Sequence, residues 1–196
     1  MNDSVSSEGH EISYIYTDIA KSIIKHGGIP VAISLDNYDT ALKLIDNCDG
    51  VILQGGDDFT DKQLRIVNHL YDCNVPTLGI CLGMQMMGVL FNGKLGKIEG
   101  HKNKLNYAHE VTISKRSLLY KILKRDKIMV NSRHNDYLIC TDLDVSAKSN
   151  VIEAIESKNR VFFLGVQWHP ESMIEYDIVA NDLFSYFIKG CIYGFK

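Results

Sequence analysis

Apolar residues in the first half of the chain recur in two alternating patterns, one typical of helices and one typical of buried strands. Isoleucines at positions 12, 15, 19 and 23 are spaced three or four residues apart and predict a helix from His10 to the Gly27–Gly28 pair. Apolar runs predict strands at 29–34, 51–53 and 75–80, and amphipathic spacing predicts helices at 38–47, 60–71 and 84–91. Strands that alternate with helices imply βαβ units and a parallel sheet.

After Gly93 the chain changes to shorter segments. Residues 94–106 are basic and polar and predict a surface excursion. Beyond them the pattern predicts strands at 109–114, 127–130, 145–147, 151–156 and 160–166, with a helical turn or two at 117–123. The last two strands fit a hairpin, and a broad apolar stripe predicts a final helix that ends at Gly190. We therefore expect a small antiparallel portion in the C-terminal half of an α/β protein.

Composition narrows the class of protein without naming an activity. A chain of 196 residues is expected to form one domain over 1–196, with the polar residues 1–9 flexible. The net charge of -3 argues against a nucleic-acid or anionic membrane surface. No apolar run is long enough to cross a bilayer, and the N-terminus does not have the pattern of a signal peptide. Five cysteines in no disulfide or zinc pattern favour a reducing compartment, so we expect a cytoplasmic protein.

One cysteine stands apart from the other four because of its neighbours. Cys81 lies between Gly79 and Gly83, where an apolar run meets a helical one. This pattern predicts a nucleophile elbow, a tight strand-to-helix turn with no room for side chains on either flank. The turn would place the sulfur over a helix N-terminus, where the macrodipole and free N–H groups favour the reactive thiolate.

Two further loops also follow apolar strands and could meet Cys81 at the carboxyl edge of a parallel sheet. His169 is the candidate base, and Glu171 lies two residues on, which in an extended segment is on the same side. The amide of Leu82 and an amide of the Gly55–Gly56 loop are the candidate oxyanion donors. His101 and His109 lack metal-ligand spacing along the chain, so we predict no metal and no cofactor.

These motifs carry a family resemblance. Residues 79–85 and 165–171 resemble the two signatures of class I glutamine amidotransferases, and residues 50–57 resemble their oxyanion loop. The resemblance extends from about the first predicted helix to the last. It implies a flavodoxin-like, doubly wound α/β fold with a mostly parallel sheet flanked by helices. It also implies a Cys81–His169–Glu171 triad that attacks a γ-glutamyl amide, with Gln85 holding the glutamyl group.

Residues 14–31, 130–134 and 167–169 are also similar to the γ-glutamyl-γ-aminobutyrate hydrolase branch, which implies that Ser132, Arg133 and His134 border the substrate pocket. Two positions depart from that branch, which commonly has arginine where Leu82 stands and proline where Gln54 stands. The fold also usually opens with an apolar strand that residues 1–9 do not supply. Either the chain starts after that strand or the sheet lacks it.

Three functions stay open at this point. The first is a cysteine hydrolase of a small γ-glutamyl amide, favoured by Trp168 and the 132–134 loop. The second is a glutaminase subunit that supplies ammonia to a partner synthase, favoured by Leu82. The third is a non-catalytic binding module on the same fold, which an intact triad argues against.

Overall fold

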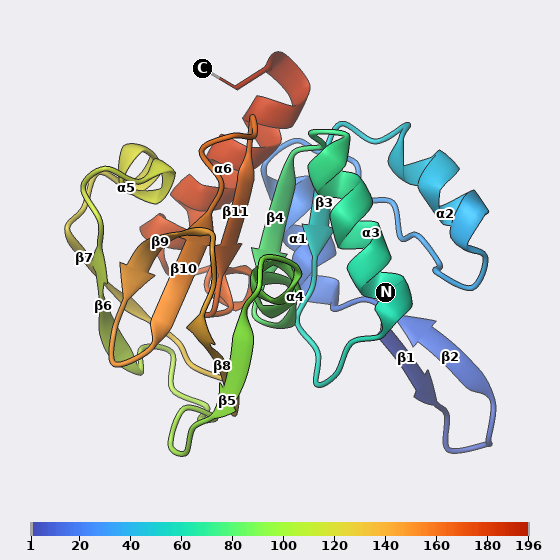
Figure 1. Ribbon diagram of the computed structural model, residues 1–196, viewed down its shortest axis with the longest axis horizontal. Coiled ribbons are helices and arrows are strands. Elements are labelled where there is room, and N and C mark those ends of the chain that lie inside the picture. The colour runs from blue at the N-terminus through green and yellow to red at the C-terminus, as the bar shows by residue number, and fades with distance from the viewer. Residues whose placement is uncertain (1, 196) are drawn as a thin grey trace.

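A seven-stranded sheet forms the centre of the computed structural model, which describes residues 2–195 (Figure 1). Its strands lie in the order β3 (Val51–Leu53), β4 (Thr77–Ile80), β11 (Phe163–Val166), β10 (Ile152–Glu156), β9 (Asp144–Lys148), β6 (His109–Ile113) and β7 (Lys127–Val130). The pairs β3–β4 and β4–β11 are parallel, and every pair from β11 to β7 is antiparallel. The predicted α/β class is confirmed, with an antiparallel portion that covers more of the sheet than the sequence predicts.

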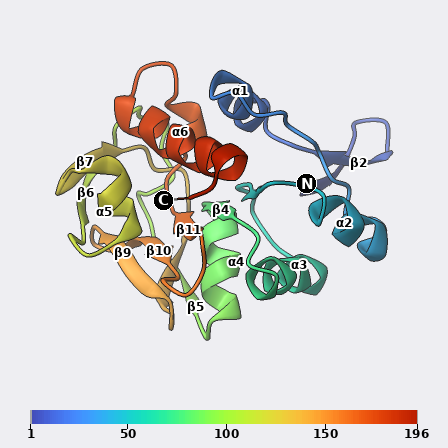
Figure 2. The same ribbon diagram turned by 90° about the horizontal axis from the view of Figure 1, so that it is seen from above.

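Helices cover both faces of this sheet (Figure 2). They are α1 (Thr17–Lys25), α2 (Tyr38–Ile45), α3 (Asp61–Asp72), α4 (Leu82–Leu90), α5 (Leu118–Leu123) and α6 (Ile178–Tyr193). One core cluster joins α5 and α6 to the sheet, and a second joins α3 and α4 to the opposite face. Strands β4 and β11 are buried on both faces, which explains their continuous apolar sequences.

The parallel register determines where the loops emerge. Leu53 pairs with Gly79, and Ile80 pairs with Val166. The carboxyl ends of β3, β4 and β11 therefore lie at one edge of the sheet. The loops that follow these strands begin side by side, although they are far apart in sequence.

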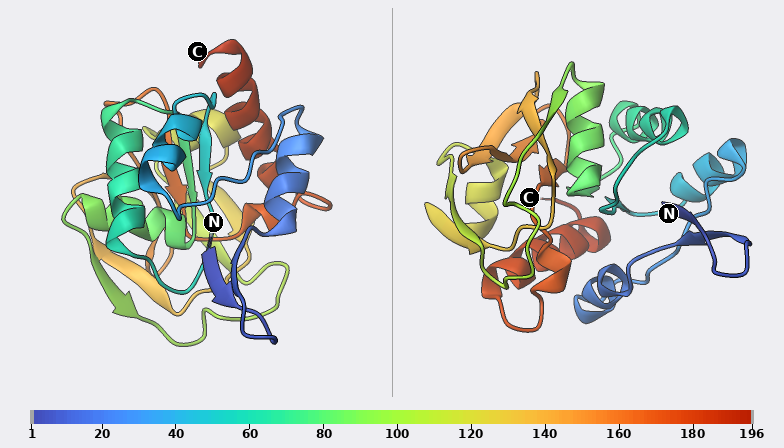
Figure 3. Two further views of the ribbon diagram at one scale, coloured as in Figure 1. Left: turned by 90° about the vertical axis from the view of Figure 1, so that its right-hand side faces the viewer. Right: turned by 90° about the horizontal axis from the view of Figure 1, so that it is seen from below.

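Two small sheets flank the main one. In the first, β1 (Asn2–Val5) pairs with β2 (Glu11–Tyr14) as a hairpin that projects from the body of the molecule (Figure 3). In the second, β5 (Lys94–Lys97) pairs with β8 (Asp136–Cys140), a strand that the sequence pattern did not predict. Residues 1–9 were expected to be flexible, and of these residue 1 lies outside the described part.

The predicted start of the first helix is wrong. Residues 11–14 form a strand, and the helix begins only at Thr17. The cause lies in a distant side chain: the amide of Gln54 donates to the carbonyl of Tyr14 and accepts from the N–H of Tyr16, each at 3.0 Å. These two bonds hold the backbone extended where the isoleucine spacing predicts a helix.

The predicted strand at 29–34 is also wrong. Ile29 is 88% exposed and Val31 61% exposed, and no residue of this segment is assigned to a strand. An apolar groove of about 590 Å³ lies between this segment and β3. Among the described residues the main sheet ends at β3, so the segment has no strand to pair with. This arrangement agrees with the expectation that the sheet lacks the usual opening strand.

The last helix extends further than predicted. It ends at Tyr193 rather than at Gly190, and Gly194 caps it with a φ of 87°. Most other elements lie within a few residues of their predicted bounds, including the capping box of Thr60 and Gln63. Within residues 2–195, no helix combines the length and the apolar character needed to cross a membrane.

Candidate active site

Cys81 occupies the turn between β4 and α4. Its φ of 52° and ψ of -104° are strained for a residue with a side chain, as expected of a nucleophile elbow. Its N–H donates to the carbonyl of Val166 at 2.8 Å, which fixes the turn against β11. A Cβ at Gly83 would collide with Leu53, so the second glycine of the motif is needed for the close approach of α4 to β3.

His169 and Glu171 lie beside this cysteine. The Nδ1 of His169 donates to Oε1 of Glu171 at 2.7 Å, and the same imidazole forms a hydrogen bond with Cys81. The pair does not come from an extended segment, as predicted, but from a single 3-10 turn, η1 (Pro170–Ser172). Burial lowers the pKa of His169, but the Glu171 carboxylate and Cys81 outweigh burial and raise this pKa to about 10.

The loop after β3 reaches the same place. A Cβ at Gly55 would lie 2.8 Å from Cε1 of His169 and 3.5 Å from Cβ of Cys81. Only a glycine allows the backbone to approach the imidazole so closely. Leu82 is the first residue of α4, where an N–H has no acceptor within the helix. The two segments predicted to supply oxyanion donors therefore flank Cys81.

Gln85 is buried in this region but is bonded to the chain itself. Its Nε2 donates to the carbonyl of Asp136 at 2.9 Å and to Oε1 of Gln167 at 3.3 Å. Gln167 in turn places its Nε2 3.6 Å from the sulfur of Cys81. The sequence motif around His169 includes Gln167 but predicts no role for it.

Asn131 is a second residue that sequence reasoning missed. Its Nδ2 donates to the carbonyl of His169, and its Oδ1 accepts from the N–H of His169, both at 2.8 Å. Asn131 is fully buried and directly follows β7. It therefore fixes the backbone of His169 from both sides. Its position directly before the 132–134 loop is the one sequence signal that points to it.

The three residues of that loop differ in their surroundings. Ser132 is buried and donates to the carbonyl of His101 at 2.6 Å. His134 is buried and its Nδ1 donates to the carbonyl of Asp136 at 2.9 Å. Arg133 is exposed and donates to the hydroxyl of Ser172, next to Glu171, at 3.1 Å. Only the arginine faces solvent at the edge of the site.

Tyr16 forms another part of the rim. Burial raises its pKa to about 12, with contributions from Tyr14, Asp57 and Cys81. The phenol therefore stays protonated and can donate a hydrogen bond beside the cysteine. The two bonds from Gln54 to the Tyr14–Tyr16 backbone hold this tyrosine at the site.

One cluster of potential metal ligands lies among the described residues. His101, His109 and Glu153 each place a ligand atom within 4.8 Å of the others, although they are distant in sequence. Spacing along the chain did not reveal this cluster.

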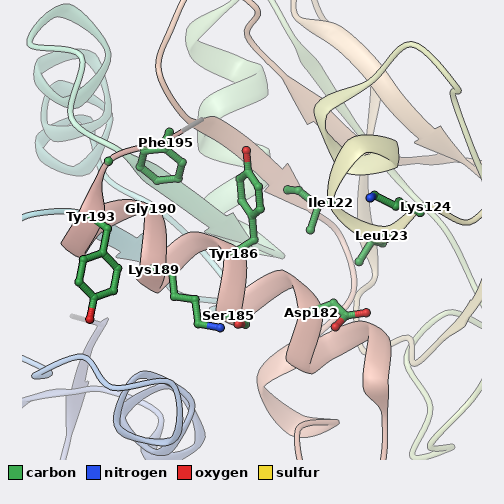
Figure 4. A pocket seen from close by; sticks show the side chains of 11 residues that line it. Ile122, Leu123, Lys124, Asp182, Ser185, Tyr186, Lys189, Gly190, Tyr193 and Phe195 are labelled. Carbon is green, nitrogen blue, oxygen red and sulfur yellow. The ribbon is translucent and has the colours of Figure 1, made fainter.

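A separate hollow of about 540 Å³ lies between α5 and the C-terminal half of α6 (Figure 4). Tyr186, Tyr193 and Phe195 line it, and its lining includes no cysteine or histidine. It lies near the upper, C-terminal end of α6 in Figure 1, whereas the arrowheads of β3, β4 and β11 point downward. The candidate chemistry is therefore at the other end of the sheet.

This fold and this site define a protein of the class I glutamine amidotransferase superfamily. More specifically, the chain belongs to the Peptidase C26 family, whose sequence profile matches residues 1–64 and 60–171. It is 27% identical to Protein NtpR of Enterococcus hirae, over 93% of this chain and 91% of that protein. It is 33% identical to the glutamine-hydrolysing subunit of GMP synthase from Methanothrix thermoacetophila, over 73% of this chain and 77% of that protein.

A solved structure is also similar in fold. The crystal structure of a protein from Thermoplasma acidophilum, described as a GMP synthase subunit, matches with a TM-score of 0.73 and 24% identity. The match covers 89% of this chain and 87% of that one. This likeness shows the shared fold.

Proposed function

We propose that the protein is a cysteine hydrolase that cleaves the γ-glutamyl amide bond of glutamine or of a small γ-glutamyl amide through a thioester. The observation that carries this proposal is one imidazole, that of His169, bonded both to Glu171 and to a cysteine on a strained elbow. Membership of the Peptidase C26 family supports a hydrolase. No cofactor is required for this chemistry.

In the first half of the reaction, the Cys81 thiolate attacks the amide carbonyl carbon, and the carbonyl oxygen takes the negative charge. The N–H of Leu82 and a Gly55–Gly56 amide stabilise that oxyanion. His169 gives its proton to the leaving amine as the C–N bond breaks. Glu171 orients the imidazole and stabilises its charged form, consistent with its effect on the pKa of His169.

In the second half, water hydrolyses the thioester. His169 accepts a proton from the attacking water, and the sulfur leaves as a thiolate with glutamate as product. Arg133, the exposed cation of the 132–134 loop, pairs with a carboxylate of the glutamyl group. Ser132, His134 and Gln85 hold the walls of the pocket through their bonds to the chain.

A second candidate function is that of a glutaminase subunit that passes ammonia to a synthase. Two observations favour it: Leu82 follows the cysteine, and one relative is named as the glutamine-hydrolysing subunit of GMP synthase. Such a subunit would act on glutamine rather than on N-substituted amides, and would depend on its partner for full activity.

Purified protein assayed alone separates the two. A hydrolase releases amines from N-substituted γ-glutamyl amides without any partner, and its glutamyl thioester on Cys81 is detectable by mass spectrometry after acid quenching. Weak turnover of glutamine alone, with no release from substituted amides, supports the subunit. Unchanged turnover in a C81A variant overturns both.

A further inference from the structure

The cluster of His101, His109 and Glu153 is built from three separate elements. His109 lies on β6, Glu153 on β10, and His101 in the connection between β5 and β6. The Nε2 of His109 is 2.7 Å from Oε1 of Glu153, and that oxygen also accepts from the hydroxyl of Ser149 at 2.7 Å. The fold therefore directs two imidazoles and a carboxylate to one point.

Glu153 shows an unmet demand for a positive charge. Its side chain is only 1% exposed, and its second oxygen, Oε2, is buried with no hydrogen-bond partner among the described residues. A buried carboxylate oxygen without a donor is costly. A bound cation would satisfy it.

The neighbouring imidazole of His134 orients His101. Because Nδ1 of His134 donates to the carbonyl of Asp136, Nε2 of neutral His134 is an acceptor. Nδ1 of His101 lies 3.3 Å from it and is therefore the donor. The lone pair of neutral His101 is then on Nε2, and a ring whose other nitrogen is hydrogen-bonded is the usual arrangement of a metal ligand.

We propose that His101, His109 and Glu153 bind a divalent transition-metal ion of the zinc class. Two imidazoles and one carboxylate are a typical ligand set for Zn²⁺, with a fourth position left for water. Ligand atoms in a tetrahedral zinc site lie about 3.3 Å apart, so side-chain shifts of the order of 1 Å complete the present arrangement. The ion replaces the hydrogen between His109 and Glu153, and His109 then carries its hydrogen on Nδ1.

The ion would act as a structural tie beside the candidate active site. Ser132 donates to the carbonyl of His101, and Asn131, one residue earlier, holds the backbone of His169. A metal at His101 would therefore fasten the 98–108 connection to β10 and support the loop that positions the imidazole. This site does not depend on the activity of Cys81.

Zinc binding to the full chain tests the proposal. Protein stripped with a chelator is titrated with Zn²⁺ by calorimetry, and metal content is measured after dialysis. We expect one zinc ion per chain and a higher melting temperature with zinc. E153Q and H109Q should each weaken binding at least tenfold, and H101Q, which changes a loop residue, does the same with less risk to folding. Binding no tighter than in E153Q overturns the proposal.

Two controls separate this site from others. H10Q removes an exposed histidine from the turn of the β1–β2 hairpin and should bind zinc like the unaltered chain. C81S removes the sulfur, because a cysteine beside a histidine could itself hold zinc. Zinc kept in C81S supports the proposal; zinc lost in C81S and kept in H101Q overturns it. Cobalt gives an independent signal, since ligation by sulfur adds an intense near-ultraviolet band.

Discussion

Two histidine–glutamate pairs in this molecule are built almost alike. In each, an imidazole nitrogen lies 2.7 Å from Oε1 of a glutamate, in the pairs His169–Glu171 and His109–Glu153. The glutamate side chains are 3% and 1% exposed, and in each the Oε2 atom is buried without a partner among the described residues. What differs is the third neighbour, which is Cys81 in the first pair and His101 in the second.

The difference teaches that the pair alone does not define a chemistry. Next to a sulfur on a strained turn, the imidazole has a raised pKa and is prepared to hold a proton. Next to further imidazoles, burial dominates: it lowers the pKa of His101 and lowers that of His134 to about 4. The first environment suits proton transfer, and the second suits neutral nitrogen ligands.

The largest expected effect is that of removing the sulfur from the first pair. C81A should reduce amide release by about 10⁴-fold or more, because no other group can form the thioester. Hydrolysis of glutamine and of a substituted γ-glutamyl amide measures this, with C140S as a matched control at an exposed cysteine. Rapid alkylation of Cys81 by iodoacetamide is expected as well. A sulfur no more reactive than that of Cys140 would favour a non-catalytic binding module.

The next effect comes from the carboxylate of the first pair. E171Q keeps the size of the side chain but removes the charge, and we expect kcat to fall by about 10²- to 10⁴-fold. The pKa of His169 should also fall, since burial alone lowers it and the main opposing charge is gone. Imidazole nitrogen shifts followed by NMR against pH report this directly. An unchanged titration would show that Glu171 does not set the charge of the ring.

Asn131 tests whether the first pair needs support from the backbone. N131A removes both bonds to the main chain of His169, and we expect kcat to fall by about tenfold with little change in KM. Two lost hydrogen bonds should also lower the free energy of unfolding by about 1–3 kcal/mol. N131D keeps the acceptor and loses the donor, so its kcat should lie between those of N131A and the unaltered chain. Equal loss in kcat and stability across substrates with KM raised instead would argue for a binding role.

The sequence predicts those parts of the site whose signal is local. Cys81 with its flanking glycines, and His169 with Glu171, are recognisable because a tight turn restricts which residues fit. Asn131 and Glu153 are not, since their roles depend on the register of β6, β7, β9 and β10, which bring residues 38 and 44 positions apart into contact. The same limit explains the wrong strand at 29–34 and the wrong helix start. An apolar run cannot reveal whether a partner strand exists, nor can isoleucine spacing reveal that Gln54 holds Tyr14 and Tyr16 extended.

The smallest effect expected is on stability, and it distinguishes the two pairs by pH. A histidine whose pKa is raised in the folded state stabilises the fold while it is protonated in both states. This contribution is complete below the unfolded value of about 6.5 and is lost as pH rises through the folded value of about 10. The free energy of unfolding should therefore decline between these limits, and chemical denaturation at several pH values measures the slope. In E171Q the slope should be shallower, whereas in H109Q it should match that of the unaltered chain. Equal slopes in all three proteins would mean that the two pairs do not differ in charge after all, and the comparison would fail.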